Sequence, residues 1–198
     1  MRIKICGLFR PEDIEYVNES LPDYVGFVFT KSRRQVSPAQ AEKLKKNLDQ
    51  RIKAVGVFVN APLEDAAELL KSGVIDLAQL HGSEDKEYIM RLKDQTGSRI
   101  IKAVRVETAE DILAAQSSPA DFLLLDHGAG GTGIAFDWSL VPECGKPFFL
   151  AGGIHAGNLG QAVRAGRPFA VDISSGAETD GVKDRDKILE IVRRVRNV

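Results

Sequence analysis

Eight short apolar runs, each followed by a longer amphipathic stretch, are the feature of this chain that most restricts its fold. The runs are rich in Val, Ile, Leu and Phe, and they cover residues 3–6, 24–29, 52–59, 76–80, 99–104, 121–126, 147–151 and 169–173. Such alternation is typical of βα units around a parallel sheet, and eight evenly spaced units favour a closed (β/α)₈ TIM barrel over an open sheet. With 198 residues, the chain would form one compact barrel domain over residues 1–198.

The amphipathic stretches carry helix signals. Ser37-Pro38 places a capping hydroxyl before a first-turn proline. The last stretch, residues 184–198, has an apolar stripe that we expect to close the barrel against the first βα unit; the stripe consists of Ile188, Ile191, Val192 and Val195. The sixth crossover differs, because only residues 136–140 could form a helical turn or two. We therefore predict a short sixth helix.

Composition excludes several classes of protein. The chain has 43% hydrophobic and 28% charged residues and a net charge of −1, with basic residues spread along it, so we expect no nucleic-acid partner. No apolar run approaches the roughly 20 residues of a membrane span, and a strand begins at once without a signal peptide, so a cytoplasmic protein without membrane contact is expected. The outer helix faces fit a monomer or a homodimer equally well.

Neither the cysteines nor the histidines form a metal or disulfide pattern. Cys6 and Cys144 are not part of a CxxC motif, and the three histidines follow different strands without a close-spaced ligand pair. We predict no metal site and a free thiol at Cys6.

Two side chains capable of proton transfer end strands directly before glycine-bearing loops. Cys6 ends the first apolar run and Asp126 ends the sixth. Because the carboxyl ends of parallel strands form the active face of such barrels, the thiol and the carboxylate are expected to face one pocket, which indicates acid/base chemistry. Taken separately, Cys6 could be a small buried hydrophobe, and Asp126 could be a helix cap or a partner of Lys102.

A buried charge pair is expected below the thiol. Lys4 lies two residues before Cys6, hence on the same side of the strand, and Asp172 lies correspondingly in the last strand, which neighbours the first when a barrel closes. We predict that Lys4 and Asp172 pair inside the barrel. The pair would either assist the thiol or merely fill the barrel floor.

Glycine-rich turns follow the last three strands and predict a phosphate site. They are Gly128-Ala129-Gly130-Gly131-Thr132-Gly133, Gly152-Gly153 and Ser174-Ser175-Gly176. Glycine lets backbone N–H groups approach phosphate oxygens, and barrels often hold a phosphate after strands seven and eight. The first turn also matches GxGxxG, but it follows a late strand and precedes no sustained helix, so a dinucleotide site is not indicated. A small phosphorylated molecule is the expected ligand, and a cation of Lys31-Ser32-Arg33-Arg34 could meet a second anionic group.

Several motifs, in this order and spacing, resemble the phosphoribosylanthranilate isomerase family of tryptophan biosynthesis almost from end to end. They are Lys4-Ile5-Cys6-Gly7, Gly26-Phe27-Val28-Phe29, Lys31-Ser32 with Arg34, Val57-Phe58-Val59-Asn60, Gln79-Leu80-His81-Gly82, Leu125-Asp126, Gly130-Gly131-Thr132-Gly133 with Phe136-Asp137-Trp138, Ala151-Gly152-Gly153 and Asp172-Ile173-Ser174-Ser175-Gly176.

The resemblance implies a cofactor-independent Amadori rearrangement with Asp126 as general acid and Cys6 as general base. It implies that Arg34 pairs with the anthranilate carboxylate, a role that passes to Arg33 if this loop is aligned one residue off. Asp126 would need a raised pKa to hold its proton. The resemblance also implies a set of groups around the phosphate and the sugar, namely Gly131, Gly133, Gly152, Gly153, Ser174 and Ser175 for the phosphate, with His81 and Asp172 lining the floor or contacting sugar hydroxyls.

Two rival readings remain open at the level of sequence. Another phosphate-binding barrel, such as a pentose-phosphate epimerase or indole-glycerol-phosphate synthase, would show metal-capable strand ends or a longer N-terminal extension with a strand-end lysine pattern, and neither is present. A non-enzymatic phosphosugar sensor could use the same scaffold, since a fold does not determine function. A sensor would need neither Cys6 nor Asp126.

Overall fold

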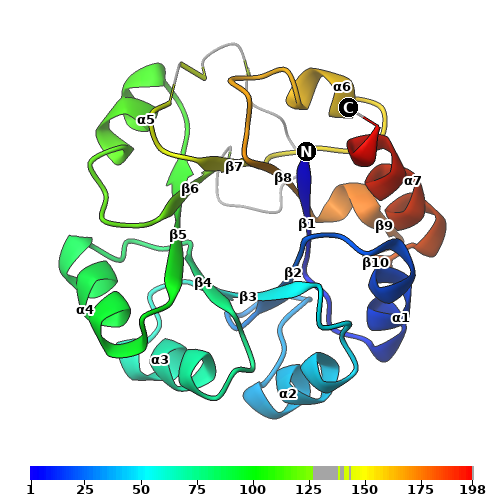
Figure 1. Cartoon of the computed structure of the whole chain (residues 1–198), viewed down its shortest axis with the longest axis horizontal. Helices are drawn as coiled ribbons and strands as arrows, with labels where there is room; N and C mark the ends of the chain where they lie inside the picture. The colour runs from blue at the N-terminus through cyan, green and yellow to red at the C-terminus, as the bar shows by residue number, and fades with distance from the viewer. Residues whose placement is uncertain (127–137, 139–140, 143, 198) are drawn as a thin grey trace.

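Eight parallel strands close into a barrel in the computed structural model, which describes residues 1–126, 138, 141–142 and 144–197. The strands follow chain order around the barrel, and β8 pairs with β1 (Figure 1). Their bounds are β1 (Arg2–Cys6), β2 (Tyr24–Val28), β3 (Lys53–Phe58), β4 (Leu77–Leu80), β5 (Arg99–Arg105), β6 (Phe122–Asp126), β7 (Phe148–Leu150) and β8 (Ala170–Ile173). The predicted (β/α)₈ barrel is therefore confirmed.

A ring of helices surrounds the barrel (Figure 1). Their bounds are α1 (Pro11–Ser20), α2 (Pro38–Lys46), α3 (Leu63–Lys71), α4 (Lys86–Thr96), α5 (Ala109–Ala115), α6 (Leu159–Ala162) and α7 (Arg185–Arg196). Ser37 caps α2 as predicted, since its side chain accepts a hydrogen bond from the Gln40 N–H. The short helix predicted after the sixth strand lies outside the described residues except for Trp138.

The strands separate two layers of side chains because successive residues of a strand point to opposite faces. In β1, Ile3 and Ile5 belong to the apolar layer between barrel and helices, whereas Lys4 and Cys6 point to the interior. The interior contains a second apolar cluster with four aromatic rings in mutual contact, Tyr24, Phe122, Phe149 and Phe169. Three of these rings stand at or before the first residue of a strand, so they fill the amino end of the barrel and leave the carboxyl end to polar side chains.

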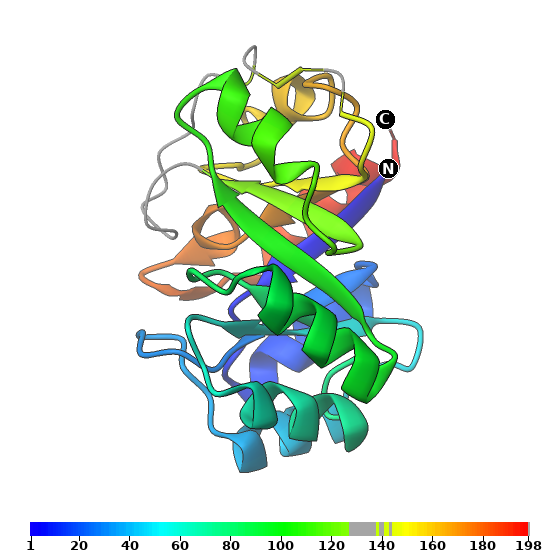
Figure 2. The same ribbon diagram turned by 90° about the vertical axis from the view of Figure 1, so that its left-hand side faces the viewer.

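The last helix closes the ring, as the sequence predicts. The four apolar residues of its stripe are buried, and α7 packs against α1 and β1. Figures 1 and 2 show the two chain ends close together, and the Arg196 guanidinium donates a hydrogen bond of 3.4 Å to the Met1 carbonyl. No helix among the described residues is long and apolar enough to cross a membrane.

A small antiparallel hairpin between β8 and α7 is the one described addition that we did not predict. It pairs β9 (Glu178–Thr179) with β10 (Val182–Lys183) and follows a single 3₁₀ turn, η2 (Ser175–Ala177). Asp180 and Gly181 at its tip both have positive φ angles, 51° and 82°, which are typical of a two-residue hairpin turn. The hairpin lies beside the carboxyl end of the barrel.

Candidate active site

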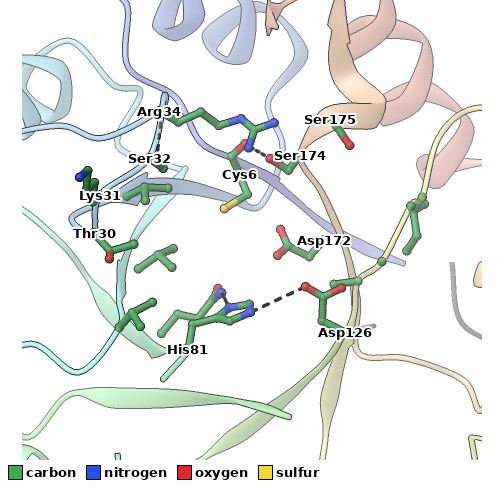
Figure 3. A pocket seen from close by; sticks show the side chains of 18 residues that line it. Cys6, Thr30, Lys31, Ser32, Arg34, His81, Asp126, Asp172, Ser174 and Ser175 are labelled. Carbon is green, nitrogen blue, oxygen red and sulfur yellow. Dashed lines mark hydrogen bonds and ion pairs between the residues drawn. The ribbon is translucent and has the colours of Figure 1, made fainter. Parts of the chain in front are cut away.

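A cavity of about 420 Å³ opens at the carboxyl ends of the strands and collects most of the predicted site residues (Figure 3). Those that line it are Cys6, Arg34, His81, Asp126, Gly152, Gly153, Asp172, Ser174 and Ser175. Gly131 and Gly133 lie outside the described residues. Thr30 and Gln79 also line the cavity and were not predicted as site residues. The strands and loops thus bring side chains from both halves of the chain into one cavity.

Cys6 owes its place in the cavity wall to Gly26 on the neighbouring strand. The two residues are paired across β1 and β2, and a Cβ atom at position 26 would lie 2.6 Å from the Cys6 Sγ. Any side chain larger than hydrogen at Gly26 would therefore push the thiol away from its position. Cys6 is buried, and its Sγ points towards the centre of the cavity in Figure 3.

The predicted pair between Lys4 and Asp172 is confirmed. The two residues are directly opposite each other in β1 and β8, and the Lys4 Nζ donates to both carboxylate oxygens at 3.0 Å. Burial alone would lower the pKa of Lys4, but the Asp172 carboxylate and, to a smaller extent, Cys6 together outweigh it, so the pKa lies above its ordinary value. An ammonium group therefore persists next to the thiol.

Opposing effects act on the pKa of the Cys6 thiol. Burial raises its pKa most, Lys4 lowers it and Asp172 raises it again, and the result lies above the ordinary thiol value. At neutral pH the free protein therefore holds a protonated Cys6 that becomes a thiolate as the pH rises. Such a thiolate is a stronger base than an ordinary one, although a smaller fraction of it exists at neutral pH.

Asp126 faces His81 across the cavity (Figure 3). The His81 Nε2 lies 3.7 Å from the Asp126 Oδ2, and the Gln79 amide donates to the His81 Nδ1 at 3.0 Å. With Nδ1 accepting, the remaining imidazole proton is on Nε2, directed at the carboxyl group. Burial and then Lys4 lower the pKa of His81, which keeps the ring neutral near pH 7.

Lys102, the alternative partner that we considered for Asp126, binds elsewhere. Its Nζ contacts the Glu84 Oε2 at 2.9 Å and the Gly82 carbonyl at 2.6 Å, both in the loop after β4. The contacts of this lysine therefore fix a loop.

Arg34 reaches the cavity over the backbone of Gly7. Gly7 has a φ angle of 85°, and a Cβ there would collide with the arginine side chain, so glycine is required at this position for two reasons. Arg34 is buried and bonded to Glu178 of the hairpin. The neighbouring Arg33 does not line the cavity, and its side chain is 56% exposed.

The loops after β7 and β8 present backbone groups to the cavity. The N–H groups of Gly152 and Gly153 donate to no described residue, although both glycines line the cavity. Ser174 is fixed by its hydroxyl, which donates to the Cys6 carbonyl at 3.2 Å. An anion bound here would therefore meet unpaired backbone N–H donors after β7 and a loop that carries serine hydroxyls after β8. No cluster of three or more potential metal ligands exists in the part of the chain that the structure describes.

Besides Thr30, sequence reasoning missed two polar residues near the cavity, Glu178 and Gln79. Asp180-Gly181 is a hairpin-turn dipeptide and could have revealed β9 and β10. Gln79 is two residues before His81 on β4, so the period of a strand places both on the same face. Neither signal identifies the partners of these residues.

The raised pKa of Cys6 predicts its alkylation behaviour. In a Cys144→Ala variant, where Cys6 is the only thiol, the rate of reaction with iodoacetamide should rise about tenfold per pH unit. It should continue to rise beyond about pH 8.5, where an ordinary thiol levels off. Mass spectrometry of quenched samples measures the rate, with free cysteine as the control. A plateau below pH 8 would mean that Lys4 dominates over burial.

Comparisons with known proteins show the family to which the chain belongs. Residues 3–194 match the family model of N-(5′-phosphoribosyl)anthranilate (PRA) isomerase. The chain is 45% identical to an N-(5′-phosphoribosyl)anthranilate isomerase of Endomicrobium trichonymphae, covering 100% of this chain and 99% of the relative.

Solved structures of the same family have the same fold as this chain. A phosphoribosyl anthranilate isomerase from Thermotoga maritima has a TM-score of 0.91 and 34% identity, with both chains covered completely. A further solved structure of a phosphoribosyl anthranilate isomerase, with a TM-score of 0.88, 34% identity and complete coverage of both chains, contains reduced 1-(o-carboxyphenylamino)-1-deoxyribulose 5-phosphate. The protein is therefore an isomerase, and its chain belongs to the N-(5′-phosphoribosyl)anthranilate isomerase family.

Proposed function

We propose that this protein converts N-(5′-phosphoribosyl)anthranilate to 1-(o-carboxyphenylamino)-1-deoxyribulose 5-phosphate in tryptophan biosynthesis, without a cofactor. The observation that carries this proposal is the convergence of Cys6 and Asp126 on one cavity with Arg34 at its edge, in a chain of this family. A relative of the same fold was solved with the reduced form of the proposed product, which supports the substrate class.

Asp126 would act as the general acid. Protonation of the furanose ring oxygen lets the bond between this oxygen and C1′ break, and the nitrogen lone pair forms the C1′ imine. Asp126 is the last residue of β6. The Val106 N–H donates to the Asp126 carbonyl at 2.9 Å, so the backbone of Asp126 is fixed by the chain that follows β5. The neutral His81 beside it would orient the carboxyl group or contact a sugar hydroxyl.

Cys6 would act as the general base. Its thiolate removes the C2′ proton, the electrons of the C–H bond form the C1′–C2′ double bond, and the resulting enolamine tautomerises to the ketone. Lys4 favours the thiolate electrostatically, since it lowers the pKa that burial raises. Asp172 keeps Lys4 charged and lines the cavity floor, where it would also meet a sugar hydroxyl.

Binding would use the two anionic ends of the substrate. Arg34 would pair with the anthranilate carboxylate, because a guanidinium matches a carboxylate with two parallel hydrogen bonds. Gly152, Gly153, Ser174 and Ser175 would surround the phosphate. Gly131 and Gly133 are proposed for the same role from the family resemblance.

Turnover of phosphoribosylanthranilate tests the function directly. The purified protein should convert freshly prepared substrate without added metal or cofactor, with a loss of anthranilate fluorescence that follows protein concentration. Identification of the ketone product by mass spectrometry after borohydride reduction excludes simple hydrolysis. Saturable binding without turnover would instead support a phosphosugar sensor.

Exchange of either proton-transfer group should lower kcat while the protein still binds product. A serine hydroxyl is a far weaker base than a thiolate, and an asparagine amide has no acidic proton to transfer, so Cys6→Ser and Asp126→Asn should each reduce kcat by about 10²- to 10⁴-fold. Product affinity, measured by calorimetry, should change by only a few-fold. Cys144→Ser is the matched control. Near-normal kcat in a folded Cys6→Ser or Asp126→Asn protein would remove that residue from the mechanism.

Replacement of Arg34 should raise KM. A charge-assisted pair contributes roughly 1.5 to 3 kcal/mol to both ground and transition states, so Arg34→Ala should raise KM by about 10- to 150-fold. Arg34→Lys should recover only part of this because the bidentate geometry is lost. Arg33→Ala is the control, since that side chain is largely exposed. A larger KM effect for Arg33→Ala would make Arg33 the anthranilate ligand.

A further inference from the structure

Glu178 lies in the hairpin behind the cavity wall and has no role in the mechanism described so far. Its side chain is only 4% exposed, and it does not line the cavity. The hairpin is firmly anchored, because the Lys187 Nζ donates to the Glu178 carbonyl at 2.6 Å and the Arg10 guanidinium donates to the Lys183 carbonyl at 3.0 Å. The Glu178 carboxylate therefore has a fixed position relative to the barrel.

Three cations converge on this one carboxylate. Its Oε1 accepts hydrogen bonds from the Arg34 Nε at 2.7 Å and the Lys183 Nζ at 2.6 Å. Its Oε2 accepts from the Arg34 Nη2 at 2.9 Å and the Arg33 Nη2 at 2.7 Å. Burial alone would raise the pKa of Glu178, but the bonds from Arg34 and the charge of Lys183 outweigh it, so the group stays ionised. One negative charge faces three positive ones, which leaves this edge of the cavity able to accept a second anion.

The geometry of Arg34 determines where that anion can bind. A guanidinium has five N–H donors arranged along two edges. Glu178 occupies the edge formed by Nε and Nη2, whereas Nη1 donates to none of the residues that the structure describes. Arg34 itself lines the cavity. The edge that includes Nη1 therefore remains for a ligand carboxylate.

We propose that Glu178 is a positioning residue, which holds Arg34 in one orientation so that its second edge is ready for the substrate carboxylate. The inference rests on the proposed function, since the carboxylate in question is that of the anthranilate ring. A long arginine side chain without a fixed partner must lose its rotamer freedom when the ligand binds, and a prior ion pair removes that cost. The effect should appear in binding and leave the proton transfers unchanged.

Glu178→Gln tests this directly, because it keeps the size of the side chain and removes its charge. We expect KM to rise by about 2- to 13-fold, the cost of ordering one flexible side chain, with kcat within about twofold of the wild type. An unchanged or lower KM would overturn the proposal, and a lower KM would mean that Glu178 competes with the substrate for Arg34.

A double-mutant cycle separates action through Arg34 from a general effect. In an Arg34→Ala background, Glu178→Gln should raise KM no further, because the residue that it positions is absent. If Glu178→Gln raises KM by the same factor in both backgrounds, Glu178 does not act through Arg34 and the proposal is wrong.

Two further variants guard against a purely structural effect. Asp76→Asn removes a partly buried carboxylate at the opposite end of the barrel, where it binds Lys45 at 2.6 Å and the Ala54 N–H at 2.8 Å; it should lower thermal stability without raising KM. If Glu178→Gln fails to fold, Glu178→Asp takes its place. This variant keeps the charge, but its side chain is one methylene shorter and reaches Arg34 less well, so it should also raise KM. A folded Glu178→Asp protein with wild-type KM would then overturn the proposal.

The outcomes also distinguish this inference from the proposed function. If the wild type fails to turn over phosphoribosylanthranilate, or if Arg34→Ala leaves KM unchanged, the proposed role of Arg34 fails and the inference falls with it. If Arg34→Ala raises KM and Glu178→Gln does not, only the positioning role of Glu178 is wrong.

Discussion

The buried ion pair between Lys4 and Asp172 is the interaction on which the candidate active site depends. It joins the first strand to the last, at the level where the barrel interior changes from aromatic packing to polar groups. A buried ammonium without this carboxylate would tend to lose its charge. Because the pKa of Lys4 lies above its ordinary value, Cys6 stands next to a cation inside the barrel, where low dielectric strengthens the attraction between that cation and a thiolate.

The second electrostatic feature lies at the edge of the cavity, where Glu178 receives three cations. The two clusters differ in net charge. Lys4 and Asp172 neutralise each other beneath the thiol, whereas the cluster around Glu178 keeps an excess of positive charge beside the opening. A substrate with two anionic ends and a neutral reacting centre fits this division, since the excess charge lies where an anion would enter and the neutral pair lies where protons would move.

The scaffold assigns different tasks to strands and to loops. The proposed acid and base are the last residues of β6 and β1, held by ladder hydrogen bonds to neighbouring strands, so their separation is set by the barrel itself. The residues proposed to bind the carboxylate and the phosphate lie in loops, and two of those loops are fixed by side-chain hydrogen bonds to other elements: Arg34 to Glu178, and the Ser174 hydroxyl to the Cys6 carbonyl. Catalytic sites commonly combine a rigid core with loops of adjustable chemistry.

Local pattern in the sequence determined the eight strands, the apolar stripe of α7 and the interior pairing of Lys4 with Asp172, because strand period, helix period and barrel closure are all readable from residue spacing. The strand bounds agree to within one residue. Only the tertiary structure decided which partner each remaining charge takes. Lys102 binds Glu84 in a loop, and Arg34 binds Glu178, which is 144 residues away in a hairpin too short to carry a periodic signal. The partner of a long polar side chain depends on distances and burial in the folded protein, and both are set only when the barrel has closed.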